Sequence, residues 1–415
     1  MKKRILILFF VSLIIGAIIG CAVYIPVYKD YQARKKEEER IANAKIVVEL
    51  AEDLELSFME NKKVSDLITY INGDIIDDYE IDTSELGSKT VKFKYINEEG
   101  ITIPYKILIN VVDDVPPSIW LGETYSVETG FNENLVEKIT CADNLDDNPV
   151  CEIIGDYNTS KAGSYPLQYK ATDNAGNVNI VDFTLKVVDP QPGGSTQSKD
   201  RGINPIADII RDYKTENTKI GIDVSSWQGD INFQAVKDSG VEFVIIRVGS
   251  TLGVDGEYFV DKKFIQNIQG FNEVGLPVGV YFYTYSYSQE KSIEEAKWVL
   301  EQINGYDVPL GVAYDWESWS FYNEFHQSFY STTLNAKAFL DTVSEAGYKG
   351  LLYSSKNYLE KVWYPIKGYD VWLAHYTDKT TYEGEYKYWQ LCSNGKVPGI
   401  NGYVDVNIMY EQEEV

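Results

Sequence analysis

Histidine, cysteine and basic residues are scarce in this sequence of 415 residues. Two histidines and four cysteines make a transition-metal site improbable. We find no Ser–His–Asp order, no HExxH motif and no glycine-rich phosphate loop. The 38 Lys and Arg residues face 63 Asp and Glu residues, and the formal net charge of −25 argues against nucleic acid as a partner, because phosphate binding needs clustered basic side chains. We therefore expect no cofactor, no metal and no nucleic acid.

One long uncharged run is present, from Ile5 to Tyr28, directly after the basic stretch MKKR. At about 1.5 Å per residue, a helix of this length crosses a hydrocarbon core of ~30 Å. Basic residues before such a run place the N-terminus in the cytoplasm. We predict a cytoplasmic stub and transmembrane anchor at 1–28, and a single-pass cell-membrane protein whose remainder is extracellular. The stretch IIGC, ending at Cys21, allows instead a lipoprotein processing site, which also tethers the chain outside the cytoplasm.

The composition of the chain changes after this uncharged run. Residues 29–46 are charged and favour a helical stalk. Two units follow, each ending in a strand, a turn and a second strand that closes on two valines, an Asp and a Pro. Alternation of period two with such turns is typical of β-sandwiches. These units resemble bacterial Ig-like modules of cell-surface proteins, and we predict them at 47–113 and 114–190.

Cys141 and Cys151 flank the polar stretch ADNLDDNPV in the second unit. We expect a disulfide between them outside the cell, and two free thiols are the alternative. The acidic residues of this stretch could hold calcium, since oxygen-rich loops suit that ion, or could form a solvated turn. They are Asp143, Asp146 and Asp147.

From 191 to 218 a stretch that begins rich in Gly, Ser and Pro reads as a linker. Beyond it, apolar strands alternate with amphipathic helical runs up to residue 415. This alternation predicts an α/β fold, a TIM-like parallel β/α barrel with some helices shortened. The chain as a whole is therefore expected to be multidomain, with the barrel at 219–415.

Carboxylates stand where the barrel strands end. Asp223 closes the first strand, Asp315 and Glu317 follow the fourth in VAYDWESWS, and Asp405 lies in the last. Catalytic groups of such barrels sit at the C-terminal strand ends. Residues i and i+2 of a strand share a face, about 6.6 Å apart, so Asp315 and Glu317 should perturb each other. One ionised and one protonated acid side by side is the arrangement that glycosidic cleavage requires.

Aromatic residues crowd the same strand ends, and sugar rings pack their C–H faces on aromatic faces. Some of these residues must fill the barrel. The candidates for substrate binding are Trp227, Tyr281, Tyr283, Trp316, Trp372, Tyr376 and Trp389.

The stretches GIDVSSWQGDINF, FVIIRVG, VGVYFYTYS, YDWE, WLAHY and YWQLCSNGKVPGINGYVDVN occur in order. Together they resemble the family 25 glycoside hydrolases, the N-acetylmuramidase lysozymes, from about Lys219 to Tyr410. The resemblance implies cleavage of the β-1,4 bond between N-acetylmuramic acid and N-acetylglucosamine in peptidoglycan. It implies that Glu317 is the proton donor, that Asp315 assists attack by the substrate's acetamido group, and that Asp223 and Asp405 line the site.

Two alternatives stay open at this point. The barrel could bind cell-wall glycan without cutting it, with the β units as adhesive modules. The chain could also be the wall-penetrating part of a larger surface apparatus, whose protein partners the sequence does not identify.

Overall fold

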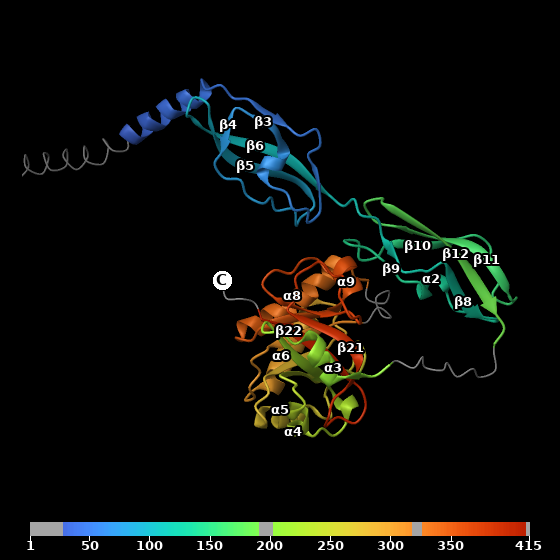
Figure 1. Cartoon of the computed structure of the whole chain (residues 1–415). Coiled ribbons are helices and arrows are strands. Elements are labelled where there is room, and N and C mark those ends of the chain that lie inside the picture. Colours follow the sequence, from blue (N-terminus) through green and yellow to red (C-terminus); the bar gives the residue numbers. More distant parts are fainter. Residues whose placement is uncertain (1–27, 191–201, 318–325, 412–415) are drawn as a thin grey trace, which may run out of the picture. The chain divides into compact units, whose positions relative to one another are not determined.

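A computed structural model describes residues 28–190, 202–317 and 326–411. The chain divides into two compact units, with the boundary between Asp114 and Val115 (Figure 1). The first unit contains one β domain. The second unit contains another β domain, at 115–190, and the barrel.

The first unit includes a helix over residues 28–42, which covers most of the predicted stalk at 29–46. Its main sheet has four strands in the order β2 (Glu55–Ser57), β6 (Thr102–Val112), β5 (Gly87–Asn97) and β4 (Gly73–Ile75). Strands β5 and β6 form a long antiparallel hairpin, whereas β2 pairs parallel with β6. A short helix η1 (Val64–Leu67) and a two-stranded sheet of β1 (Val48–Leu50) and β3 (Ile68–Ile71) complete the domain.

The second β domain repeats this plan. Its sheet has the order β10 (Val150–Ile154), β11 (Gly163–Thr172), β12 (Val178–Val188) and β8 (Thr124–Glu128), with β8 parallel to β12. A two-stranded sheet joins β7 (Ser118–Ile119) to β9 (Cys141–Ala142), and α2 (Leu135–Lys138) lies between β8 and β9. Cys141 and Cys151 form a disulfide between β9 and β10.

The predicted Ig-like sandwiches at 47–113 and 114–190 were wrong as folds. Each domain has one four-stranded sheet with a parallel pair and one two-stranded sheet, instead of two packed antiparallel sheets of about seven strands. Alternating hydrophobicity gave the strands correctly, as in β5, where buried and exposed residues alternate. It says which face of a strand is buried, but it does not say which strands pair or in which direction.

The C-terminal domain is a closed barrel. Seven strands follow one another as parallel neighbours. They are β14 (Thr218–Val224), β15 (Phe243–Thr251), β17 (Val278–Tyr283), β18 (Val312–Asp315), β19 (Gly350–Ser355), β20 (Asp370–Ala374) and β21 (Tyr388–Lys396). The eighth, β22 (Val404–Tyr410), pairs antiparallel with both β14 and β21 and closes the ring.

The predicted TIM-like barrel therefore needs correction, because the sheet is mixed and the helical ring is incomplete. Among the described residues, helices connect only the earlier strands: α4 (Phe233–Asp238), α5 (Phe264–Glu273), α6 (Gln289–Ile303), α8 (Phe329–Glu345) and α9 (Lys356–Lys361) (Figure 1). Strands β20, β21 and β22 follow one another without a helix. A parallel connection requires a crossover, whereas the short link from β21 to β22 lets the chain turn back, so the last strand runs antiparallel. The strand count was predictable, but this direction was not.

Strand alternation separates the barrel into two cores. Outward residues such as Val280 pack against the helices in the larger core. Inward residues fill the barrel itself, namely Phe243, Ile245, Ala313, Leu351, Tyr353, Trp372, Tyr388 and Met409. These side chains fill the interior of the barrel below the rim formed by the C-terminal ends of the parallel strands. The polar groups at that rim therefore lie on a layer of packed hydrophobic side chains.

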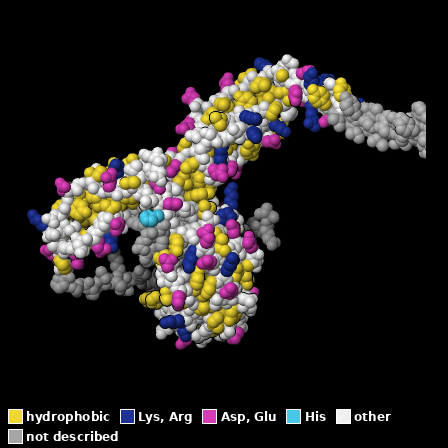
Figure 2. Space-filling view, turned by 180° about the vertical axis from the view of Figure 1, so that it is seen from behind, with side chains coloured by type: hydrophobic (Ala, Val, Ile, Leu, Met, Phe, Trp, Pro, Cys, Tyr) yellow, Lys and Arg dark blue, Asp and Glu magenta, His cyan; other side chains and the backbone are white. Residues whose placement is uncertain are grey.

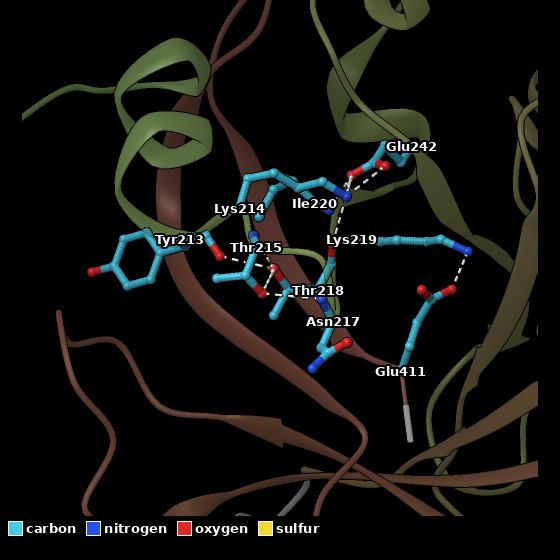
Figure 3. Close-up of polar contacts among 9 residues, drawn as sticks. All are labelled: Tyr213, Lys214, Thr215, Asn217, Thr218, Lys219, Ile220, Glu242 and Glu411. Atoms are coloured by element: carbon cyan, nitrogen blue, oxygen red, sulfur yellow. Dashed lines mark hydrogen bonds and ion pairs between the residues drawn. The ribbon is translucent and has the colours of Figure 1, made fainter. Parts of the chain in front are cut away.

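The predicted linker at 191–218 is too long. Helix α3 (Ile206–Tyr213) and the short strand β13 (Asn204–Pro205) precede β14, and Ile206 and Ile209 belong to the barrel's larger core. Polar contacts fix the turn from α3 into β14 (Figure 3). Lys214 Nζ reaches both carboxylate oxygens of Glu242 at 2.8 Å, and Lys219 pairs with Glu411.

The predicted anchor at 1–28 falls almost entirely on residues 1–27, outside the described residues. Within 28–190, 202–317 and 326–411, no helix is both long enough and apolar enough to cross a membrane. The single-pass placement in a cell membrane that we predicted from this run therefore has no spanning helix to support it among the described residues. On the surface that Figure 2 shows, acidic and basic side chains are interspersed, so the excess of acid is spread over this face.

Candidate active site

The four predicted acids lie at one end of the barrel. Asp223 is next to last in β14, Asp315 ends β18, and Glu317 follows two residues later. Asp405 is the second residue of β22. Because β22 runs antiparallel, its beginning lies beside the ends of the parallel strands, and Asp405 is the direct partner of Asp223 in the strand register. The strand directions thus bring together acids that are far apart in the chain.

Asp223 is buried and held by two amides. Its Oδ2 accepts hydrogen bonds from Gln390 Nε2 at 2.9 Å and from Asn407 Nδ2 at 2.8 Å. Burial raises the pKa of Asp223 to about 6, the two amide hydrogen bonds oppose this shift, and the charge of Glu317 adds to it. The carboxyl is therefore positioned rigidly and titrates well above an ordinary Asp.

Asp315 and Glu317 form a hydrogen-bonded pair of carboxyls. Burial raises the pKa of Asp315 well above its usual range, and the charge of Glu317 raises it further. The pKa of Glu317 is also raised, chiefly by the protein atoms that surround it, while hydrogen bonds with Asp315 and Tyr353 lower it. Asp315 is buried, whereas Glu317 is exposed at the cleft. A concave site explains why Glu317 is exposed and yet has a raised pKa, since the tip of its side chain reaches water while protein surrounds its other sides.

Asp405 completes the group. Burial and then the charge of Asp223 raise the pKa of Asp405 to about 8. All four acids therefore have raised pKa values, with burial as the largest cause in each, and the charges of neighbouring acids add to the shifts of Asp223, Asp315 and Asp405. Such a cluster retains protons at a pH where exposed carboxyls have lost theirs, which is the property that a general acid needs.

Arg247 supplies positive charge at the same rim. It follows the inward residues Phe243 and Ile245 on β15, and its charge lowers the pKa of Asp315. The guanidinium is held away from the carboxyl pair by Asp261, whose Oδ2 accepts from Nη2 at 2.5 Å and from Nε at 2.8 Å. Because Arg247 is already paired, it only partly offsets the repulsion among the acids.

Tyrosines connect the acids to the floor of the site. Tyr353 and Tyr376 both donate to Oε1 of Gln390, at 2.9 and 3.1 Å. The ring of Tyr353 stands on Trp372, with 4.6 Å between the centroids, and Trp372 Nε1 donates to Asn407 Oδ1 at 2.7 Å. Gln390 and Asn407 thus link the aromatic floor to Asp223.

A cleft of about 520 Å³ opens beside Glu317. Its lining residues come from the segment after β18, from β19 and α9, and from the end of β20 and the residues after it, and they include tyrosines and charged side chains. They are Glu317, Tyr353, Ser355, Lys356, Asn357, Tyr358, Glu360, Ala374, His375 and Tyr376. The exposed acid therefore faces a space large enough for a sugar ring.

The predicted aromatic residues fall into two groups. Trp227 is 84% exposed on the short helix η2 (Ser226–Gln228), and Tyr376 is 57% exposed at the cleft. Tyr281 and Tyr283 are half-buried on β17, where burial raises the pKa of both hydroxyls and the charge of Asp315 adds to each shift. Three tryptophans are buried and present no free face for a sugar: Trp316, Trp372 and Trp389.

Sequence reasoning missed several residues of the site. Gln390 and Asn407 are polar, buried and placed at the strand positions that face the acids. A polar residue within an apolar strand was the available signal, because its burial needs a partner. Tyr353 and Arg247 gave the same signal in GLLYSS and FVIIRVG.

Comparison with known proteins shows what the barrel domain is similar to. Residues 222–400 match the family model described as "Glycosyl hydrolases family 25". The chain is 28% identical to an autolytic lysozyme of Clostridium acetobutylicum over 189 residues, which are 45% of this chain and 54% of that relative. It therefore spans about half the length of this curated relative. It is also 28% identical over 221 residues to the uncharacterized protein YegX of Escherichia coli K12, covering 50% of this chain and 75% of that one.

Solved structures of similar proteins include a family 25 glycosyl hydrolase from Bacillus anthracis. That match has 23% identity and a TM-score of 0.42, and it covers 49% of this chain and 93% of the other. The modular autolysin LytC from Streptococcus pneumoniae, in complex with a synthetic peptidoglycan ligand, matches with 20% identity and a TM-score of 0.42, over 83% of this chain and 74% of the other.

Proposed function

We propose that this chain, whose residues 222–400 match the model of glycosyl hydrolase family 25, hydrolyses peptidoglycan as an N-acetylmuramidase. Its substrate is the β-1,4 bond between N-acetylmuramic acid and N-acetylglucosamine. The observation that carries this proposal is the cluster of four carboxyls with raised pKa values, one of them exposed to a cleft of about 520 Å³.

We assign the role of proton donor to Glu317. It is the member of the carboxyl pair that is exposed at the cleft, so its proton can reach a glycosidic oxygen. As the bond breaks, the leaving oxygen takes this proton and Glu317 becomes a carboxylate. Asp315 lies beside it, buried and hydrogen-bonded to it, and assists attack by the acetamido group of the substrate.

Asp223 and Asp405 line the site beside the carboxyl pair. Positive charge develops on the sugar ring as the bond breaks, and the carboxylate of Asp223, with a pKa of about 6, favours it, whereas Asp405, with a pKa of about 8, keeps its proton at neutral pH. Gln390 and Asn407 hold the carboxylate of Asp223, so this group needs little reorientation when the positive charge develops. Trp227 and Tyr376 supply exposed aromatic faces for the sugar rings.

Digestion of purified peptidoglycan by the full chain tests the proposal. The products are reduced with borohydride and analysed by mass spectrometry, which identifies the sugar at each new reducing end. We expect reduced N-acetylmuramic acid. Reduced N-acetylglucosamine would assign the other glycosidic bond, and released stem peptides would assign an amide bond. Chain that sediments with the glycan and releases nothing would indicate a binding module.

A further inference from the structure

Helix α8 finds acceptors for its first backbone N–H groups in a different domain. The first turn of a helix leaves N–H groups without partners inside the helix. Phe329 N donates to the carbonyl oxygen of Asp143 at 2.9 Å, and Tyr330 N donates to the carbonyl oxygen of Asn144 at 3.0 Å. Both carbonyls belong to the loop after β9 in the second β domain. Phe329 is buried, so loss of this acceptor would leave a buried donor unsatisfied.

A side chain of the same loop reinforces the contact. Asp147 Oδ1 accepts from the backbone N of Ser328, the N-cap residue, at 2.7 Å, and from Ser331 Oγ at 2.9 Å. A carboxylate at this position also interacts favourably with the positive end of the helix dipole. Asn144 donates through Nδ2 to the hydroxyl of Tyr364 at 3.3 Å. The loop at 143–147 therefore fits this helix end through backbone and side-chain contacts together.

An apolar contact lies beside the polar one. The ring of Trp120, after β7, meets Tyr358 of α9 edge-on, with centroids 6.0 Å apart. Lys361 of α9 places its Nζ over the Trp120 ring, 5.4 Å from the centroid. Ala142 is fully buried and belongs to the same core cluster as the barrel's outer layer. The two domains thus share a continuous packed region.

The disulfide restrains the loop that makes these contacts. Cys141 and Cys151 bracket residues 143–147, with a sequence separation of 10. A short cross-linked loop has less conformational freedom to lose when it docks. Asp143 Oδ2 also accepts from the backbone N of Leu145 and of Asp146, at 2.8 Å each, which orders the loop internally.

The contact reaches the cleft through Tyr358. This residue lines the cleft together with Glu317, and the charge of Glu317 raises its pKa after the larger effect of burial. Its ring also lies 6.1 Å from that of Trp316, the residue between the paired acids. Tyr358 is therefore supported by Trp120 on one side and faces the acid site on the other.

We propose that the second β domain, residues 115–190, is a fixed part of the hydrolase that positions the Tyr358 side of the cleft. This domain contacts α9 through Trp120 and contacts α8 through the loop 143–147. It is therefore more than a spacer. This inference rests on the proposed function of the barrel. Trp120 and Asp147 are positioning residues, since neither is placed to touch the substrate.

Hydrogen exchange and kinetics of the full chain test this proposal together. We compare wild type with Asp147→Ala and Trp120→Ala, and with Asp156→Ala as a matched control on an exposed turn of the same domain. In both test variants the amides of Phe329 and Tyr330 should exchange at least about tenfold faster, since their acceptors are held less firmly. The KM for glycan strands should rise about three- to tenfold with kcat nearly unchanged.

Each outcome bears on one part of the proposal. Unchanged exchange at the start of α8 in both variants would overturn the docking, and faster exchange with unchanged KM would overturn the positioning role. If Trp120→Ala unfolds the β domain, Tyr358→Leu tests the exchange at α8 from the barrel side, because it removes the Trp120–Tyr358 ring contact without changing the β domain. A wild-type chain without activity would count against the proposed function, while the exchange result still decides the docking.

Discussion

Asp223 and Asp405 lie opposite each other on neighbouring antiparallel strands, although 182 positions separate them in the chain. Like charges directly opposite on a sheet repel. The consequence is visible in the pKa of Asp405, which reaches about 8 because of burial and the charge of Asp223. The fold therefore brings these acids together at a cost in stability, as expected for a site built for chemistry.

The pH dependence of activity should respond to Asp223→Asn. The charge of Asp223 raises the pKa of Asp315, the partner of the proposed donor. A general acid works while it is protonated, so activity falls as pH rises through the pKa of the pair. Removal of one negative charge lowers that pKa, and the alkaline limb of kcat/KM should move to lower pH by about one unit. Asp238→Asn, on an exposed helix end, is the control. An unmoved limb would mean that Asp223 does not influence the acid.

Glu317→Gln should lower kcat about 10²- to 10⁴-fold, because glutamine cannot give a proton to the leaving oxygen. Binding of glycan, measured by sedimentation, should persist, since the amide keeps the shape of the side chain. Glu301→Gln, exposed on α6, should retain full activity. Equal release of reducing ends by wild type and Glu317→Gln would reassign the donor.

Trp227→Ala should weaken substrate binding without unfolding the barrel. The side chain is 84% exposed, so little packing is lost. Loss of one stacking face corresponds to about 1 kcal/mol, and KM should rise about three- to tenfold with kcat retained. Tyr157→Ala, an exposed aromatic residue of the second β domain, serves as the control. A fall in kcat alone would place Trp227 outside the binding surface.

Glu295→Gln should stabilise the protein at alkaline pH. Glu295 on α6 is fully buried, and burial raises its pKa to about 7, opposed by a hydrogen bond from Thr284 Oγ1. The folded state therefore binds the proton more tightly than the unfolded state. Stability is highest below the unfolded pKa and falls as pH rises towards 7, by up to about 3 kcal/mol. The Tm advantage of Glu295→Gln over wild type should be larger at pH 8 than at pH 5. The exposed Glu294→Gln should show no such difference.

Replacement of Cys141 and Cys151 by serine should destabilise the second β domain by about 2 to 3 kcal/mol, because the disulfide restrains the unfolded chain. The loop between them supplies acceptors to α8, so exchange at Phe329 and Tyr330 should also become faster. Denaturant unfolding measures the first effect and hydrogen exchange the second. An effect on stability with no effect on α8 would separate the disulfide from the docking contact.

The neighbouring carboxyls of the candidate site could be predicted from the sequence. Asp315 and Glu317 are two positions apart at a strand end, and that spacing alone predicts neighbouring carboxyls. The strands of the β domains were also predictable, because period-two alternation is a local pattern. Their sheet pairing was not, since the parallel pairs β2–β6 and β8–β12 join segments far apart in sequence.

By itself the sequence determined the kinds of side chain available and the strands that carry them: acids at strand ends, aromatics nearby and few basic groups. Only the tertiary structure decided which of them meet. The reversal of β22 brings Asp405 beside Asp223. Hydrogen bonds from Gln390 and Asn407 hold the carboxylate of Asp223. Closure of the barrel buries Trp372. The physical reason is that burial, pKa and hydrogen bonding depend on neighbours from distant segments, whereas a sequence pattern reports only the nearby chain.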